Sequence, residues 1–208
     1  GIVFTRNEDL YWKIRRASDR GKPFGLDEGA TNQIASLNFN LNDLAATIGS
    51  VQLARLPEIV ARRRAIVAQI AQQTRGLACV SVPKPLEGAD PSYWFLRMRF
   101  HGERCAVDKE AFLDAVTAEG LTPVIRNYAA HCPHRFEWYS RRRVFGTSGY
   151  PWTSPDYAGD ADRQFPCPNA LRAGDTNFNI HFHESWTDDD TADCAAILRK
   201  VDAAYAER

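Results

Sequence analysis

Residues 177–183 alternate strictly between polar and apolar side chains, and this alternation limits the possible folds more than any other feature. The apolar members are Phe178, Ile180 and Phe182, and the polar members are Asn177, Asn179, His181 and His183. Successive side chains of a β-strand point to opposite faces, so a period of two predicts a strand with one apolar and one polar face. The apolar face needs a hydrophobic layer against it, which places the strand in a sheet covered on one side.

The segments around this strand predict the rest of a small layered domain. Residues 93–100 and 121–125 have the composition of two further strands. Residues 108–118 begin with an aspartate, a preferred N-cap, and predict a helix, and Thr187 followed by three aspartates opens a last one. Residues 133–168 are rich in proline and aromatic residues and predict an irregular region. The order strand, helix, strand, long excursion, strand, helix is that of a small α+β domain.

The first part of the chain predicts helices without a sheet to cover. Asn7 caps an expected helix that runs to about Ser18, after a short apolar strand at residues 2–4. Residues 21–36 predict a long loop. Helical periodicity then extends over residues 42–73, where Pro57 predicts a break into two helices because proline disrupts a helix interior. Within the second of these, Arg62, Arg63 and Arg64 predict a solvated surface with one or two salt bridges.

The change in pattern places a domain boundary between residues 76 and 90. We expect residues 1–80 to be the tail of one domain and residues 81–208 to be a complete second domain. Domains usually have about 100–150 residues, so 208 residues have room for one domain and part of another. The chain begins with Gly1 rather than methionine, and we expect it to be a piece of a longer protein.

Composition excludes several classes of function. The 26 basic side chains balance 26 acidic ones, which argues against a nucleic-acid-binding protein because such binding needs clustered excess positive charge. No apolar run approaches the roughly 18 residues of a membrane span, and the N-terminus lacks a basic leader. The five cysteines are scattered without paired spacing, which predicts free thiols in a reducing compartment. We therefore expect a cytoplasmic protein that does not bind membranes.

The residues themselves suggest three chemical sites. A metal could be ligated by His131 and His134 beside Cys132, or by His181 with His183. No carboxylate completes either pair at a known spacing, so no metal site is predicted. A nucleophilic thiol at Cys132 is disfavoured because catalytic cysteine and histidine usually come from distant segments. The basic run at residues 141–143 could contact phosphates, although such a run is more often a solvated turn.

Four segments, in this order, resemble the DegT/DnrJ/StrS family of nucleotide-sugar aminotransferases. They are residues 1–10 (GIVFTRNEDL), residues 37–56 (LNFNLNDLAATIGSVQLARL), the run GLTP at residues 120–123 with Tyr128 and His131, and FPCP at residues 165–168, which looks like a short strand of the family. The resemblance implies a pyridoxal-phosphate (PLP) enzyme with the aspartate-aminotransferase fold, known as fold type I. It implies an α/β chain made of the end of the large PLP-binding domain, residues 1–80, and the small α+β C-terminal domain, residues 81–208.

The same resemblance assigns candidate site residues. In the family, a side chain at this helix entrance reaches into the neighbouring subunit and binds the PLP phosphate, which implies a homodimer with shared active sites. Asn40 occupies that position and Asn38 lies two residues before it. Amide donors and a helix N-terminus both suit an anion, but Asn40 and Asn42 could instead simply cap the following helix. Tyr128, His131, His181 and His183 are the candidates for the substrate wall.

The lysine that carries PLP in this family is expected upstream of Gly1. The five lysines present lie on expected surface helices, loops or the proline-rich bend: Lys13, Lys22, Lys84, Lys109 and Lys200. The chain is therefore expected to contain no catalytic residue and to be inactive alone. The implied parent enzyme transfers an amino group from glutamate or glutamine to a keto sugar, which is expected to be nucleotide-linked, or to a cyclitol. A PLP-dependent sugar dehydratase of the same fold and a non-catalytic partner or regulator remain alternatives.

Overall fold

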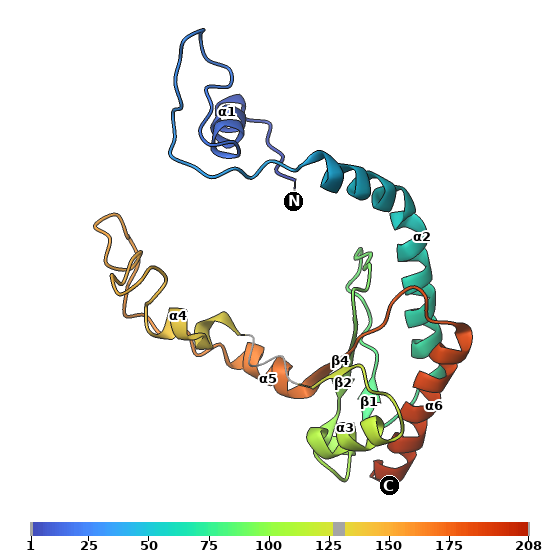
Figure 1. Ribbon diagram of the computed structural model, residues 1–208. Coiled ribbons are helices and arrows are strands. Elements are labelled where there is room, and N and C mark those ends of the chain that lie inside the picture. The colour runs from blue at the N-terminus through green and yellow to red at the C-terminus, as the bar shows by residue number, and fades with distance from the viewer. Residues whose placement is uncertain (1, 127–131, 208) are drawn as a thin grey trace. The chain divides into compact units, whose positions relative to one another are not determined.

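The structure is a computed structural model that describes residues 2–126 and 132–207 (Figure 1). The chain forms two compact units, Gly1–Leu56 and Pro57–Arg208, and each is considered by itself. The assignment of residues 1–80 to a larger domain stays a prediction. No helix in the described ranges is both long and apolar enough to cross a bilayer.

The N-terminal unit begins with helix α1, Glu8–Ala17. The side chain of Asn7 accepts a hydrogen bond from the Leu10 amide at 2.9 Å, so the predicted cap is confirmed. The strand expected at residues 2–4 is wrong, because these residues adopt no regular structure and their side chains are exposed. A strand needs a hydrogen-bonded neighbour, and the described part of this unit supplies none to them.

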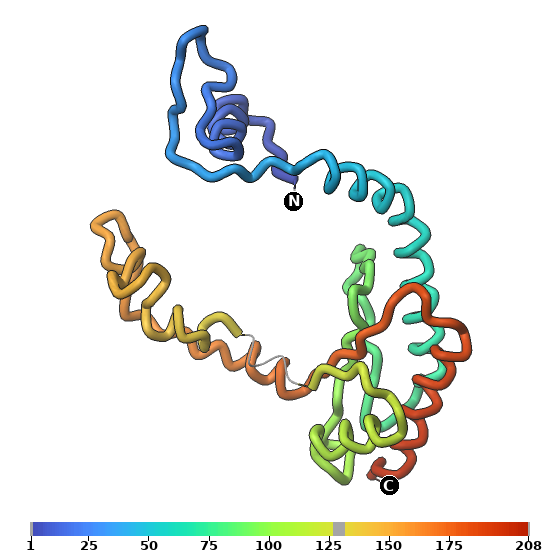
Figure 2. Tube along the Cα trace, viewed as in Figure 1, coloured from blue at the N-terminus to red at the C-terminus, as the bar shows by residue number. Residues whose placement is uncertain are grey.

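A long loop follows α1, as predicted, and returns to the end of that helix (Figure 2). The Arg20 amide donates to the Leu37 carbonyl at 3.1 Å, and the Phe39 amide donates to the Ser18 carbonyl at 2.8 Å. Gly21 lies at the start of the loop with φ 75°, and a Cβ atom there would meet the Ile34 carbonyl oxygen at 1.9 Å. The close approach of these two backbone segments therefore requires glycine.

Helix α2, Asp43–Gln73, is a single helix with Pro57 inside it. The prediction of two helices is wrong. Proline removes its own amide hydrogen bond and its ring crowds the carbonyl of the preceding turn, but the residues on either side can continue the helical ladder at a cost in free energy. Pro57 is exposed and marks the boundary between the two compact units.

The C-terminal unit is built on an antiparallel four-stranded sheet with the order β1-β2-β4-β3. Its strands are β1 Val80–Ser81, β2 Leu96–Phe100, β3 Val124–Ile125 and β4 Asn177–Ile180. The strands predicted at residues 93–100, 121–125 and 177–183 are confirmed with shorter bounds. Strand β1 was not predicted, because two residues carry no readable alternation.

One face of the sheet is covered by helices (Figure 1). They are the C-terminal part of α2, helix α3 Lys109–Ala118 and helix α6 Asp188–Tyr205. Leu96 and Met98 of β2 and Phe178 and Ile180 of β4 are almost fully buried on this face. Helix α3 is capped by the Asp108 side chain, as predicted. Helix α6 begins with a reciprocal capping box between Thr187 and Asp190, which confirms its predicted start.

The long segment that connects β3 to β4 contains only short helices in its described part. They are η3 Pro133–Arg135, α4 Glu137–Ser140 and α5 Pro168–Thr176, and a further short helix, η1 Gly102–Arg104, follows β2. The strand suggested by the FPCP run at residues 165–168 is wrong. Cys167 has φ 44° and caps α5, and Pro168 is the first residue of that helix, where its missing amide hydrogen is harmless.

Candidate functional site

In the N-terminal unit, Asn38 and Asn40 lie where the long loop returns to the end of α1. Asn38 forms an isolated antiparallel bridge with Asp19. The backbone amide of Asn40 donates to Asn38 Oδ1 at 3.0 Å. The loop therefore holds the two predicted phosphate-binding residues next to each other and beside the residues that follow α1.

Asp19 is the buried charged group of this cluster, with 3% of its surface exposed. It pairs with Lys22 Nζ at 2.7 Å and with the Arg20 guanidinium at 2.9 Å. Lys22 first, then Arg20 and the Asn40 side chain, lower the pKa of the Asp19 carboxyl from 3.8 to about 2. The cluster carries one negative and two positive charges, so it has a net positive charge near the two asparagines.

The capping role left open for the helix entrance belongs to Asn42. Its Oδ1 accepts from the Ala45 amide at 2.8 Å, and its carbonyl accepts from the Ala46 amide at 2.9 Å. The side chain of Asn40 instead faces Asp19. Asn40 is therefore not needed to cap α2.

In the C-terminal unit, the face of the sheet opposite the buried apolar residues is polar and carries arginine and asparagine side chains. Arg97 of β2 lies opposite Asn179 of β4, and Arg99 lies opposite Asn177. Arg97 Nε donates to Asn179 Oδ1 at 3.3 Å. Asn177 Nδ2 donates to the Ala173 carbonyl of α5 at 2.6 Å, which ties this face to the neighbouring helix.

His181 and His183 are both exposed, as predicted for a polar face, but they have different neighbours. The ring of His181 stacks on Phe95 with centroids 5.9 Å apart, and its amide donates to the Pro123 carbonyl at 2.8 Å. His183 Nδ1 is hydrogen-bonded to the Ser185 hydroxyl. The two imidazoles therefore have separate partners, Phe95 and Ser185.

The arginine run of α2 is more strongly engaged than predicted. Arg62 pairs with Asp188 at 3.0 Å, Arg63 with Glu184 at 3.0 Å and Arg64 with Asp90 at 2.7 Å. The interpretation as a solvated surface with one or two salt bridges is therefore wrong, because the 100° step along a helix lets successive side chains reach segments on different sides of it.

Arg63 is the least exposed of the three, with 16% of its side chain accessible. It also donates to the Tyr93 carbonyl at 2.9 Å and the Trp94 carbonyl at 3.0 Å. The pKa of Glu184 is lowered by its own backbone amide and by Arg63. Arg63 thereby fixes the segments that lead into β2 and out of β4.

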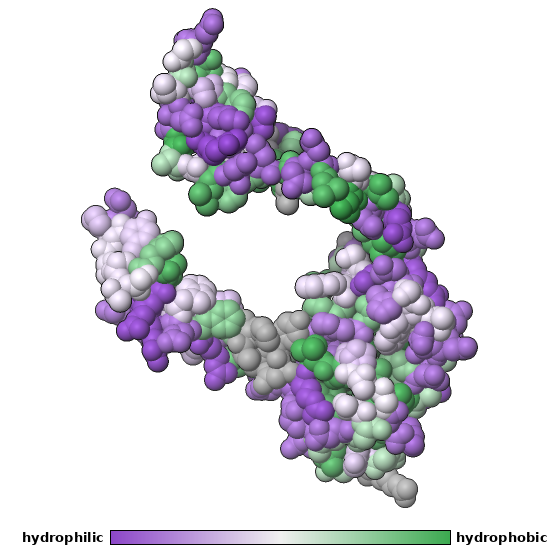
Figure 3. All heavy atoms as spheres, in the orientation of Figure 1, coloured by the Kyte–Doolittle hydropathy of each residue, from purple (hydrophilic) through white to green (hydrophobic). Residues whose placement is uncertain are grey.

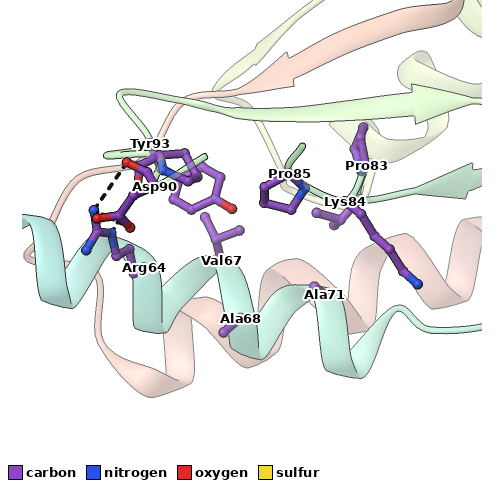
Figure 4. A pocket seen from close by; sticks show the side chains of 11 residues that line it. Arg64, Val67, Ala68, Ala71, Pro83, Lys84, Pro85, Asp90 and Tyr93 are labelled. Carbon is purple, nitrogen blue, oxygen red and sulfur yellow. Dashed lines mark hydrogen bonds and ion pairs between the residues drawn. The ribbon is translucent and has the colours of Figure 1, made fainter. Parts of the chain in front are cut away.

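A separate pocket lies between α2 and the proline-rich segment at residues 82–93 (Figure 4). It has a volume of about 330 Å³. Figure 4 shows Tyr93 and Pro85 over Val67 of α2, with the ion pair of Arg64 and Asp90 at one end. The lining is mainly apolar, and sequence analysis did not find this pocket because no motif marks it.

Comparison with protein-family models identifies the family of the chain. The model of the DegT/DnrJ/EryC1/StrS aminotransferase family matches residues 1–143. The chain belongs to this family. Because the match covers both the helix entrance at residue 40 and strand β2, it includes parts of both compact units.

Solved structures show the same fold. An aminotransferase from Psychrobacter cryohalolentis has a TM-score of 0.71 and 18% identity, with coverage of 96% of this chain and 50% of that chain. TlmJ, an aminotransferase from Streptoalloteichus hindustanus, has a TM-score of 0.60 and 24% identity, covering 96% and 46%. 3-Amino-5-hydroxybenzoic acid synthase has a TM-score of 0.66 and 21% identity, covering 97% and 49%. The chain spans about half the length of these proteins, and the prediction that it has the C-terminal portion of this fold is confirmed.

The surroundings of the lysines are relevant because a lysine carries PLP in this family of aminotransferases. Lys22 is paired with Asp19, and Lys200 with Glu119. Lys109 Nζ donates to the Gly174 carbonyl at 3.1 Å and the Asn177 carbonyl at 3.4 Å. These three ammonium groups have partners within the chain, and the expectation that the PLP-carrying lysine lies upstream of Gly1 stays a prediction.

Tyr128 and His131, predicted for the substrate wall, lie outside the described residues. Among the described residues, no group of three or more metal-ligating side chains comes together. Burial raises the pKa of the Cys194 thiol to about 12, so this cysteine stays protonated at neutral pH.

Proposed function

We propose that the protein containing this chain is a PLP-dependent aminotransferase that acts on a keto sugar, carried on a nucleotide, or on a cyclitol. The family match over residues 1–143 is the observation that carries the proposal. Solved structures with this fold support it, and they include the sugar aminotransferase CalS13 from Micromonospora echinospora and PLP and PMP forms of a Streptococcus pneumoniae aminotransferase. Glutamate or glutamine is the proposed amino donor.

In this proposal, Asn38 and Asn40 hold the phosphate of PLP. The donor set of the N-terminal unit fits a phosphate, because two side-chain amides lie beside the cations Arg20 and Lys22. The negative charge of Asp19 is already compensated by these cations. Bound PLP would supply the electron sink needed to move an amino group, and this chain would anchor its phosphate.

The polar face of the C-terminal unit is the proposed contribution to the substrate wall. His181 presents an exposed ring stacked on Phe95, and His183 presents an exposed imidazole held by Ser185. Exposed imidazoles can donate and accept hydrogen bonds to sugar hydroxyls. Tyr128 and His131 remain proposed members of the same wall.

We also propose that the enzyme is a homodimer with shared active sites. In the described residues 2–56 no apolar side chain is buried, and large apolar residues of the helix entrance such as Leu37, Phe39 and Leu41 are about 70% exposed. Apolar surface is visible on this unit in Figure 3. Such surface is stabilised by contact with further polypeptide, and a second copy would provide part of that contact.

A half-reaction tests the proposed function. The full-length gene product that carries these residues should be loaded with PLP and mixed with L-glutamate alone. We expect the absorbance of bound PLP to convert to that of pyridoxamine phosphate with release of 2-oxoglutarate. Asn40→Ala should weaken PLP binding about tenfold, because it removes a charge-assisted hydrogen bond, whereas Gln33→Ala, in the same loop and with its side chain bonded to the Thr31 carbonyl, should not. Absence of conversion with both glutamate and glutamine would contradict the proposal.

A further inference from the structure

Asn179, on the polar face of the sheet, has a buried hydrogen-bond donor without a partner. Only 1% of the surface of Asn179 is exposed. Its Oδ1 accepts from Arg97 Nε at 3.3 Å, and among the described residues its Nδ2 has no partner. A guanidinium can only donate, so the oxygen must face Arg97 and the nitrogen must be the unused atom. An unpaired buried donor is unfavourable, and native structures rarely retain one without a reason.

A cavity of about 250 Å³ adjoins this amide. Arg97, Asn177, Phe178 and Asn179 line it from the sheet, Ala170, Ala173 and Gly174 of α5 line it from the other side, and Cys132 also borders it. The small residues of α5 leave space in front of the asparagines. The cavity is therefore of the size of an amino acid or a small organic acid rather than of a nucleotide.

The charges and hydrogen bonds of the lining select the ligand. Among the described residues that line the cavity none has a carboxylate, and Arg97 brings a positive charge to it. Asn177 Nδ2 is already used by the Ala173 carbonyl, so Asn179 Nδ2 is the amide donor that remains. A ligand that fits must accept hydrogen bonds and carry negative charge. A carboxylate does both and matches the planar donor geometry of a guanidinium.

We propose that this cavity binds the carboxylate group of a small organic acid, with Asn179 Nδ2 and the Arg97 guanidinium as its donors. No sequence motif marks either residue. The Arg97 guanidinium lies 5.6 Å from the centroid of the Phe95 ring, and His181 stacks on that ring. Neither ring lines the cavity itself, so the proposed donors are those of Arg97 and Asn179.

Two sources of the carboxylate share this chemistry. If the proposed aminotransferase function holds, the ligand is the amino-acid donor, and that identification rests on the proposed function. Otherwise the ligand is a simple carboxylic acid. The binding site itself requires neither PLP nor a lysine, so it can be tested when the proposed function fails.

Nuclear magnetic resonance of the 15N-labelled 208-residue chain tests the site directly. The Asn179 side-chain NH2 resonance should be followed during titration with sodium propionate, with L-glutamate and, as a control, with sodium chloride at matched ionic strength. We expect a saturable shift of this resonance with the carboxylates and none with chloride. Tighter binding of glutamate than of propionate identifies an amino acid as the ligand, and equal binding identifies a simple acid.

Matched variants separate the proposed donors from general electrostatics. Arg97→Gln should weaken carboxylate binding about tenfold or more, because it removes a charge-assisted donor. Arg99→Gln removes the same charge two residues along the same strand, but Arg99 does not line the cavity, so binding should be unchanged. Asn179→Leu should abolish binding.

Thermal unfolding provides a second measurement that does not depend on assigning the resonance. Propionate should raise the unfolding temperature of the wild-type chain and of Arg99→Gln, but not of Arg97→Gln. The proposal is overturned if the resonance does not saturate and no stabilisation occurs, if chloride has the same effect, or if Arg99→Gln weakens binding as much as Arg97→Gln.

Discussion

At the scale of single residues, the buried Asp19 shows how one carboxylate organises the loop that carries Asn38 and Asn40. Its partners Lys22 and Arg20 are 43% and 53% exposed, yet Asp19 itself is almost completely covered. A buried carboxylate is tolerated because two cations and an amide compensate it. The candidate phosphate site therefore depends on Asp19 being ionised.

Acid should weaken this loop over a defined range of pH. The pKa of Asp19 is depressed from 3.8 to about 2, so its contribution to stability is complete above 3.8 and is lost as the pH falls through about 2. We expect a 13C titration of the Asp19 carboxyl to have its midpoint near the lower value. Asp19→Asn should remove this pH dependence, and a midpoint close to 3.8 would show that the ion pairs do not form.

Arg63 is the residue that the sequence described least well. A run of three arginines looks like solvated surface, since no local pattern reveals that Glu184 and the carbonyls of residues 93 and 94 lie around the helix. Contacts between residues about 120 positions apart are set by tertiary packing. The cap formed by Asn42 could be anticipated because it depends on neighbouring residues, whereas the phosphate-binding roles of Asn38 and Asn40 stay predictions.

We expect Arg63→Met to lower the free energy of unfolding by about 2 kcal/mol, because it leaves Glu184 and two carbonyls without their donor. Arg64→Met is the matched control, since Arg64 and its partner Asp90 are 40% and 78% exposed. Its loss should be below about 1 kcal/mol. Urea unfolding of both variants gives the comparison, and equal losses would mean that Arg63 is not a tertiary anchor.

At the scale of elements, helix starts were predictable and helix continuity was not. Asn7, Asp108 and Thr187 cap their helices through contacts within three residues, which sequence alone can indicate. Strand β4 was predictable from its alternation, whereas β1 has only two residues. The unbroken path of α2 through Pro57 depends on the rest of the helix, not on the local preference of proline.

The proline inside α2 should cost stability. Pro57→Ala restores an amide donor within the helix, and Pro57 is exposed, so little packing is lost. We expect the free energy of unfolding to rise by about 1–3 kcal/mol in urea titrations. Glu58→Ala, at the next position, should change it by less than about 0.5 kcal/mol. A destabilised Pro57→Ala variant would show that the helix does not run through this residue.

At the scale of the whole molecule, the two units differ in how they are stabilised. The buried apolar residues of the described ranges run from Ile66 to Val201 and come from the sheet, the helices that cover it and the segments that connect them. The described part of residues 2–56 buries no apolar side chain and is held by hydrogen bonds and the Asp19 ion pairs. The first unit therefore needs further polypeptide for its stability.

Separate expression of the two units tests this difference. We expect residues 57–208 to unfold cooperatively in urea and to keep dispersed NMR signals. Residues 1–56 alone should lack stable structure, since they cannot bury enough apolar surface to offset the entropy of folding. A cooperatively folded 1–56 peptide would contradict this interpretation.

The most direct test of the central claim is covalent trapping of the cofactor. The full-length gene product should be loaded with PLP, reduced with borohydride, digested and analysed by mass spectrometry. We predict a pyridoxyl group on a single lysine outside residues 1–208. The central claim is that this chain supplies the phosphate and substrate contacts of a PLP-dependent aminotransferase. It would be contradicted by the absence of any modified lysine. It would also be contradicted by a pyridoxyl group on a lysine within the chain, which means Lys13, Lys22, Lys84, Lys109 or Lys200.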